Sequence, residues 1–174
     1  MEGARRRNKI IELLKSRQTP VSGSELARLM GVSRQVIVQD IALLRALDKN
    51  ILSTNKGYIL YDPYVGRERA RRTIAVCHTD EEMREELYTI VDCGGRVLDV
   101  VVEHDVYGQM TGDLILKNRL DVDEFIEKIK SSGSQSLMTL TGGRHFHTIE
   151  ADTEEELDRI EKRINAAFGE ARRP

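Results

Sequence analysis

The chain of 174 residues is 32% charged and 40% hydrophobic, which suits one domain or two small ones. No apolar run approaches the ~18 residues that a membrane span needs, and the first residues lack the apolar core of a signal peptide, so we expect a soluble, cytoplasmic protein. Only two cysteines occur, Cys77 and Cys93, and their spacing favours free thiols over a disulfide framework.

The net charge of −2 conceals an asymmetry between the two halves of the chain. Residues 1–72 carry 15 Lys or Arg and 7 Asp or Glu, whereas residues 73–174 carry the remaining 12 and 22. The front half is therefore suited to meeting a polyanion and the back half is not. Because a charged stretch is often only a solvated surface, this reading needs a fold to support it.

The first expected elements are three helices. Residues 4–17 place apolar side chains in one stripe, as an amphipathic helix does. A short helix follows in "SELARLMG", with Ser24 as its expected N-cap and Gly31 as its end. Another begins at once in "VSRQVIVQDIALLRAL", with Ser33 as its N-cap. Two helices joined by so short a turn predict a helix-turn-helix.

The third helix has one apolar side, formed by Ile37, Ile41 and Leu44. Its opposite side is polar or short, as a helix in the DNA major groove needs, and consists of Gln35, Val38, Gln39 and Ala42. Glutamine pairs with an adenine edge, and small apolar side chains touch a thymine methyl. Ser33 and Arg34, at the helix N-terminus, are expected to face bases and phosphates. The alternative is an ordinary helical hairpin with a solvated face.

A hairpin directly follows this helix. Residues 51–60, "ILSTNKGYIL", predict two short strands about an Asn-Lys-Gly turn, which is typical of the wing of a winged helix. Its tip places Lys56 near the phosphate backbone. We therefore expect a winged helix-turn-helix DNA-binding domain over 1–62 and a linker over 63–72, whose arginines add salt-sensitive attraction to DNA.

The remaining segment, 73–174, predicts a second domain with the element order β-α-β-β-α-β-β-α. Its strands are expected at 73–78, 96–104, 106–117, 136–143 and 144–151, and its helices at 79–95, 121–132 and 153–169. Thr79 or Asp80 is the expected N-cap of the first helix and Asp121 that of the second. This order predicts an α+β sandwich in which helices cover one face of a mainly antiparallel sheet.

Two histidines, His145 and His147, stand at alternate positions of the strand "RHFHTIE" and share a face with Ile149. Residues two apart on a strand lie about 6.5 to 7 Å apart at Cα, so both rings can converge on one metal ion. The alternative is a pair of partly buried histidines that form hydrogen bonds with neighbouring groups.

Two further side chains complete a candidate metal site. His78 ends a buried strand directly before a helix, where ligand-binding residues are common. Glu86 lies at the edge of the apolar side of the next helix, unlike the acids at 81, 82 and 85. Three imidazoles and one carboxylate suit a divalent transition metal, with nickel and zinc as the first candidates and iron and cobalt as the others.

On these residues, the chain resembles the niacin-responsive transcriptional repressors, which join a biotin-repressor-like winged helix to a 3H domain. The resemblance spans the chain and rests on "VSRQVIVQDIALLR", His78, "EHDVYG" and "HFH". It implies a homodimer that binds a palindromic operator and represses NAD biosynthesis or niacin transport genes with nicotinic acid as co-repressor. It also implies a divalent metal held by the histidines and an acid. Asp105 stands where we expect proline in some relatives.

Two residues are candidates for the effector pocket, His104 and Arg144. His104 either lines the cavity of the other histidines or is a structural histidine. Three rival functions stay open: a metal-dependent regulator without an organic effector, a metal-dependent hydrolase of a niacin-like ligand, and a biotin ligase. The last is disfavoured because the chain is short and lacks a GRGRxGR loop. We expect a regulator and not an enzyme, because the same chain carries a DNA-binding domain and the candidate metal site.

Overall fold

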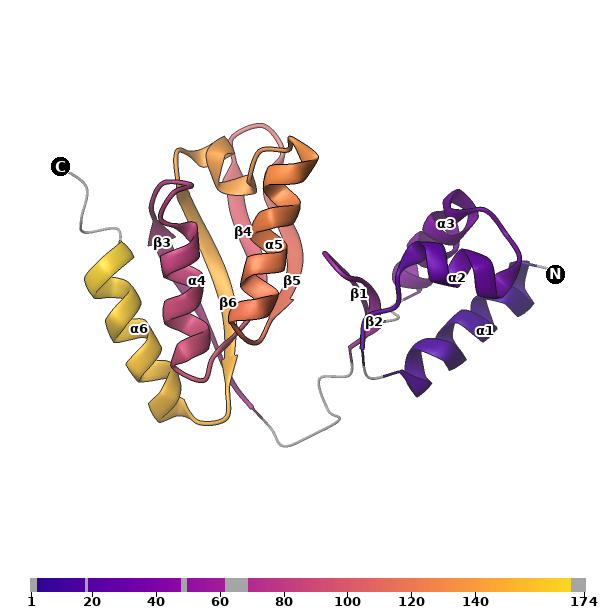
Figure 1. The fold of residues 1–174 in the computed structure, drawn as a ribbon, viewed down its shortest axis with the longest axis horizontal. Coiled ribbons are helices and arrows are strands. Elements are labelled where there is room, and N and C mark those ends of the chain that lie inside the picture. The colour runs from indigo at the N-terminus through magenta and orange to yellow at the C-terminus, as the bar shows by residue number, and fades with distance from the viewer. Residues whose placement is uncertain (1–2, 18, 48–49, 62–68, 170–174) are drawn as a thin grey trace. The chain divides into compact units, whose positions relative to one another are not determined.

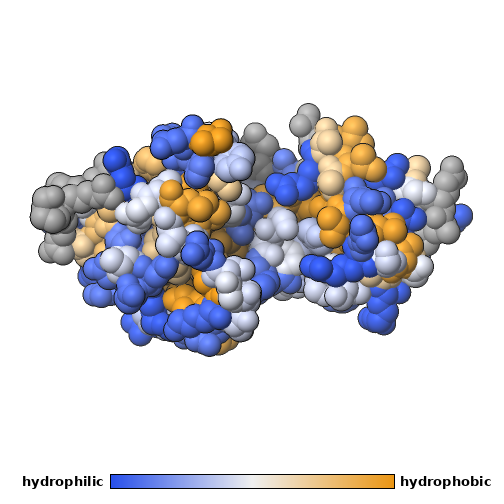
Figure 2. Space-filling view, turned by 90° about the horizontal axis from the view of Figure 1, so that it is seen from above, coloured by the Kyte–Doolittle hydropathy of each residue, from blue (hydrophilic) through white to orange (hydrophobic). Residues whose placement is uncertain are grey.

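The structure is a computed structural model that describes residues 3–17, 19–47, 50–61 and 69–169. Its chain divides into two compact units, residues 1–65 and 66–174, which are described separately. On the face drawn in Figure 2, hydrophilic side chains predominate and apolar atoms form smaller patches. None of the described helices is long and apolar enough to cross a membrane.

The first unit is the predicted three-helix module with a hairpin (Figure 1). It consists of α1 (Gly3–Ser16), α2 (Gly23–Met30), α3 (Arg34–Ala46), β1 (Ile51–Thr54) and β2 (Gly57–Leu60). The apolar side predicted for α3 is buried in its core. Val21 pairs with Tyr58 through two backbone hydrogen bonds of 2.8 Å, which tie the hairpin to the segment before α2.

One cap in this unit differs from the prediction. Ser22, and not Ser24, caps α2, because Ser22 has an extended backbone and its hydroxyl accepts a hydrogen bond from the Glu25 N–H at 3.1 Å. Gly31 ends α2 in the left-handed conformation, at φ 66°, as expected. Ser33 caps α3 as predicted.

The second unit is an α+β sandwich, as predicted. Its elements are β3 (Ala70–Cys77), α4 (Met83–Asp92), β4 (Arg96–His104), β5 (Gly108–Leu116), α5 (Arg119–Ser132), the 3₁₀ helix η1 (Leu137–Thr141), β6 (Arg144–Ala151) and α6 (Glu154–Phe168). The sheet order is β3-β6-β4-β5, and every neighbouring pair is antiparallel. The three α-helices cover one face of this sheet (Figure 1).

The strand predicted over 136–143 is wrong, because residues 137–141 form η1 and the sheet has four strands in this unit. Local hydrogen bonds explain the difference: the Thr139 hydroxyl donates to the Ser136 carbonyl, and the Thr141 hydroxyl donates to the Met138 carbonyl at 3.1 Å. Gly142 then ends η1 with φ 61°, a left-handed conformation that interrupts extended structure.

The predicted linker also needs correction at its C-terminal end. Residues 62–68 lie outside the described part of the chain, and residues 70–72 belong to β3. Arg72 donates hydrogen bonds to acids of α6, at 2.8 Å to Glu154, 2.7 Å to Asp158 and 2.6 Å to Glu161. This arginine therefore joins a strand to a helix within the second unit.

Two predicted helix caps are wrong in this unit. The α4 helix begins at Met83, after a turn in which Thr79 donates its N–H to the Glu82 carboxylate at 2.9 Å. The α5 helix is capped by Asn118, whose side chain accepts from the Asp121 N–H at 3.0 Å. Asp121 lies in the first turn and accepts from the N–H of Lys117 at 2.9 Å, so its side chain ties the helix to the residue before the cap.

Candidate metal centre and DNA-facing surface

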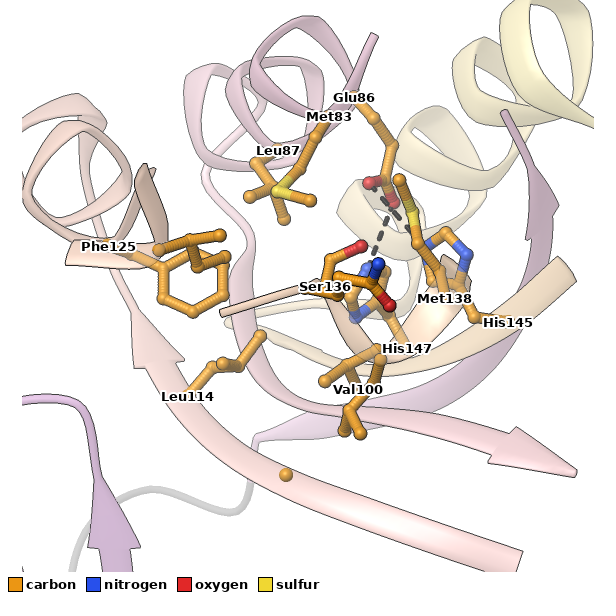
Figure 3. A pocket seen from close by; sticks show the side chains of 14 residues that line it. Met83, Glu86, Leu87, Val100, Leu114, Phe125, Ser136, Met138, His145 and His147 are labelled. Carbon is orange, nitrogen blue, oxygen red and sulfur yellow. Dashed lines mark ion pairs between the residues drawn. The ribbon is translucent and has the colours of Figure 1, made fainter. Parts of the chain in front are cut away.

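The three histidines of the candidate metal site converge on Glu86. His78 directly follows β3, and His145 and His147 occupy alternate positions of β6, which pairs with β3. Glu86 projects from α4 toward His145 and His147 (Figure 3), and it also contacts His78. All four side chains are buried, and Glu86 is 0% exposed. The antiparallel pairing of β3 with β6 and the packing of α4 over the sheet thus bring together residues far apart in the chain.

The Nε2 atoms of the three rings face the Glu86 carboxylate. His78 Nε2 lies 3.0 Å from Glu86 Oε2, and His145 Nε2 lies 3.9 Å from the same oxygen. His147 Nε2 lies 3.2 Å from Glu86 Oε1 without the angles of a hydrogen bond. Potential ligand atoms of His78, Glu86 and His145 all lie within 4.8 Å of one another. The four side chains that were predicted to meet are therefore in one cluster.

The other ring nitrogen of each histidine contacts a backbone carbonyl. His78 Nδ1 lies 2.8 Å from the Thr79 oxygen and His145 Nδ1 lies 2.9 Å from the Gly143 oxygen. His147 Nδ1 lies 2.5 Å from the Asp99 oxygen. Because a carbonyl only accepts, each Nδ1 must carry the proton, and each neutral ring then turns a lone pair at Nε2 toward Glu86. Metal-binding histidines in proteins have this arrangement.

A carboxylate facing three lone pairs requires a positive charge between them. When protons supply it, burial raises the pKa of Glu86, but the positive charge of a protonated His147 and the close contacts with the three imidazoles outweigh burial and hold the pKa well below its ordinary value. Burial lowers the pKa of His78 and His147, yet Glu86 raises both above the ordinary histidine value. Burial prevails at His145 and lowers its pKa. Protons or a metal cation can supply the missing charge.

Two backbone features that hold the histidines were not predicted. The Gly143 carbonyl accepts from the His78 N–H at 3.3 Å as well as from the His145 ring, and a Cβ on Gly143 would collide with the His78 carbonyl oxygen. A shift in the pairing of β4 with β6 leaves the Asp99 carbonyl available to His147, and the Asp99 carboxylate accepts from the Thr148 N–H at 2.8 Å. The Gly-Gly pair was the only sequence signal for the first feature.

A cavity of about 230 Å³ adjoins the cluster (Figure 3). Glu86, His145 and His147 form one part of its wall, and most of the rest is apolar. Side chains from α4, β4, β5, α5 and the segment around η1 line it: Met83, Leu87, Val100, Gly112, Leu114, Phe125, Ile129, Gln135, Ser136, Leu137 and Met138. The centre of the second unit thus offers a small apolar space beside potential metal ligands.

The two candidate effector residues, His104 and Arg144, do not line this cavity. They lie together at a separate, more polar hollow of about 470 Å³. His104 Nδ1 accepts from the Val106 N–H at 3.2 Å and the Tyr107 N–H at 3.3 Å, which is a turn-stabilising role. Of the two expectations for His104, the structure favours the structural histidine, because the end of β4 places it away from the other three.

In the first unit, the predicted DNA-facing residues lie on the surface. Ser33 and the α3 residues Arg34, Gln35, Val38 and Gln39 are at least partly exposed, and Lys56 is exposed in the turn between β1 and β2. Val38 is 44% exposed, although it is apolar. The side of α3 opposite the core is therefore accessible along its length, as a helix that enters a DNA groove requires.

A buried acid on α3 was not predicted to have a role. Asp40 is 2% exposed and accepts from Arg6 Nε at 2.5 Å and from Arg7 Nη1 at 3.3 Å, both on α1. Helical periodicity places Asp40 next to the apolar side, but it does not show which cations meet it. These contacts join α3 to α1.

Comparison with known proteins matches each of the two units to a domain family. Residues 6–59 match an HTH domain family and residues 71–167 match the 3H domain family. The chain is 44% identical over 155 residues to the "Probable transcription repressor NiaR" of Thermotoga maritima, covering 89% of this chain and 87% of that protein. It is 43% identical over 157 residues to the "Transcription repressor NadR" of Bacillus subtilis, covering 90% and 87%. Both relatives are named as regulators of transcription and not as enzymes.

Proposed function

This chain belongs to the family of the NiaR and NadR transcription repressors, and from that premise we propose that it represses NAD biosynthesis or niacin transport genes with nicotinic acid as co-repressor. The winged helix reads the operator, and the 3H domain senses nicotinic acid with the help of a divalent metal. The protein acts in the cytoplasm as a homodimer on a palindromic operator, with the dimer contacts in the 3H domain.

DNA recognition is assigned to α3 and the hairpin. Gln35 and Gln39 are the candidates for base contacts, because glutamine pairs with adenine in the major groove. Arg34 and Ser33 lie at the helix N-terminus, where backbone N–H groups also favour phosphate. Lys56, at the hairpin turn, adds a phosphate contact that increases affinity without selecting sequence.

One observation carries the metal assignment: three buried histidines, each fixed by a backbone carbonyl at Nδ1, turn Nε2 toward one buried carboxylate. This donor set fits a divalent transition metal, held by His78, Glu86, His145 and His147. Imidazole and carboxylate ligands suit nickel, zinc, iron and cobalt, and nickel or zinc is the metal that we propose. When bound, the metal supplies a positive charge at the edge of the cavity.

The cavity next to this cluster is the proposed site for nicotinic acid. Its largely apolar wall, with Phe125 among its side chains, suits a flat aromatic ring, and the adjoining cluster suits a polar group on that ring. Nicotinic acid combines these two features. Its binding alters the dimer and hence the separation of the two α3 helices, which must match half-sites about one DNA turn apart.

The test is fluorescence anisotropy of labelled DNA from upstream of niacin-salvage genes. Metal-loaded protein is titrated with and without nicotinic acid at fixed salt, since affinity for DNA depends on salt. We expect nicotinic acid to tighten operator binding and to leave binding to unrelated DNA unchanged. A response to metal alone, unaffected by nicotinic acid, would instead identify a metal-dependent regulator without an organic effector.

A further inference from the structure

The cavity beside the metal centre has two chemically different ends. At one end lie the Glu86 carboxylate and the rings of His145 and His147. Figure 3 shows Phe125 at the opposite end, with Leu114 and Val100 along one wall and Leu87 across from them. A ligand that fills the space must therefore be polar at one end and apolar at the other.

The charges of the wall decide which end of a ligand meets which end of the cavity. Among the described residues, no lysine or arginine lines the space. An acidic group placed near Phe125 would lose its hydration without gaining a partner, which is costly. At the other end, a divalent metal with one carboxylate and three neutral imidazoles leaves one positive charge. A ligand with one negative charge balances it, whereas a neutral ligand leaves it uncompensated.

The space for the ring depends on Gly112 of β5. A Cβ at this position would lie 3.2 Å from Leu137 Cδ1 and 3.4 Å from Val100 Cγ1, both on the cavity wall. Any larger side chain would therefore press on Leu137 and Val100 and reduce the room in the cavity that these residues line. The glycine meets no metal ligand within 4 Å of that added atom, so a substitution there alters the space without touching the cluster.

We propose that the cavity selects a planar aromatic ring bearing a single carboxylate, with the carboxylate at the Glu86 end and the ring toward Phe125, and that Gly112 sets the room for the ring. This inference rests on the proposed function and deepens it from one effector to a rule of charge, orientation and size. The rule predicts that the acid group is essential and that a nitrogen in the ring is dispensable for binding.

Isothermal titration calorimetry of the metal-loaded full chain tests the rule with three probes: nicotinate, benzoate and nicotinamide. We expect nicotinate and benzoate to bind, and nicotinamide to bind at least about tenfold more weakly, because its amide leaves the charge unbalanced. Equal affinity for nicotinate and nicotinamide would overturn the charge rule. Binding of nicotinate without binding of benzoate would overturn the orientation, because the ring nitrogen would then be required.

The size rule is tested with Gly112→Val, using Thr111→Val as the matched control. Thr111 is the preceding residue of β5, so its side chain points to the other face of the sheet, and Thr111→Val places a valine in the same strand by exchanging one hydroxyl for a methyl group without adding volume to the cavity. We expect Gly112→Val to weaken nicotinate and benzoate at least about tenfold, with metal content and thermal midpoint retained, because filled space excludes the ring. Unchanged affinity would refute the role of Gly112, and Gly112→Ala serves if the valine variant does not fold.

These measurements separate the inference from the proposed function. If the carboxylates bind in preference to the amide but operator affinity does not respond to nicotinate, the selectivity rule stands and the co-repressor function fails. If nicotinate tightens operator binding and nicotinamide does so equally, the function stands in outline and the rule fails. If none of the three probes binds the metal-loaded protein, both fail.

Discussion

His78 Nε2 lies 3.0 Å from Glu86 Oε2, and both side chains are almost completely shielded from solvent. The other ring nitrogen of His78, Nδ1, contacts the Thr79 carbonyl oxygen, so the backbone and not the carboxylate alone determines the orientation of the imidazole. A buried pair of this kind is costly unless a proton or a metal cation balances it. The relationship leads to predictions about metal binding, and the first unit supplies further ones.

Replacing both His145 and His147 with alanine should abolish metal retention and blunt the response to nicotinic acid. The two changes remove half of the proposed ligands, and the remaining pair cannot hold a divalent ion tightly. Metal content after dialysis, measured by inductively coupled plasma mass spectrometry, and operator anisotropy are the readouts. His104→Ala is the control and should keep its metal. An unchanged response to nicotinic acid in the double variant would make any metal structural at most.

Metal should raise the thermal midpoint of the wild-type chain and should not raise that of the double variant. A cation that binds only the folded state stabilises it by mass action, by about 2.7 kcal/mol at a free concentration 100 times the dissociation constant. Differential scanning fluorimetry with an external dye, with chelator and then with nickel or zinc, measures this because the chain has no tryptophan. Equal shifts in both proteins would count against the cluster as the binding site.

Gly143→Ala should lower both stability and metal affinity. The added Cβ would collide with the carbonyl oxygen of His78, and the backbone at Gly143 has φ +89°, so both space and conformation oppose the change. Gly133→Ala is the matched control, because Gly133 also has a left-handed backbone, at φ +65°, but has open space around its position. We expect a conformational cost of about 1 kcal/mol in the control and a clearly larger one at Gly143. Urea unfolding compares them, and equal decreases in stability would contradict the role of the collision.

Asp40→Ala and Gln39→Ala should separate positioning from recognition in α3. Removing Asp40 deprives Arg6 and Arg7 of their buried partner, so we expect a lower thermal midpoint together with weaker operator binding. Gln39 is exposed, so its removal should weaken operator binding at unchanged thermal midpoint. The measurements are thermal unfolding and anisotropy on the same preparations. Retained operator affinity in the Gln39 variant would exclude it as a base contact.

Lys56→Ala should weaken binding to all DNA sequences alike. A lysine at the hairpin turn is placed to bind phosphate, and removing one such charge should reduce the slope of log affinity against log salt by about 1. Operator and unrelated DNA are each titrated over a range of salt. Weakening confined to the operator would indicate that Lys56 reads bases, contrary to the assignment.

Local patterns were sufficient for much of the fold. The helical stripe in 4–17, the cap at Ser33 and the turn before Gly57 depend on neighbours within a few residues, so the helix-turn-helix and hairpin could be predicted. The strand prediction for 136–143 failed because the apolar residues of this segment suit a strand. Its hydroxyl groups and glycines instead form local hydrogen bonds and left-handed turns, which the spacing of apolar residues does not reveal.

For the site, alternation along a strand by itself determined that His145 and His147 share a face, and helical period placed Glu86 at the edge of a buried side. Only the tertiary structure decided that Glu86 of α4 meets His78 and both histidines of β6, with all three imidazoles turned by backbone carbonyls toward this carboxylate. It also decided that Gly143 must lack a side chain and that His104 lies at a separate hollow. The reason is physical: these relationships depend on strand pairing, register and helix packing, which join residues far apart in the chain, whereas periodicity reports only the immediate neighbourhood.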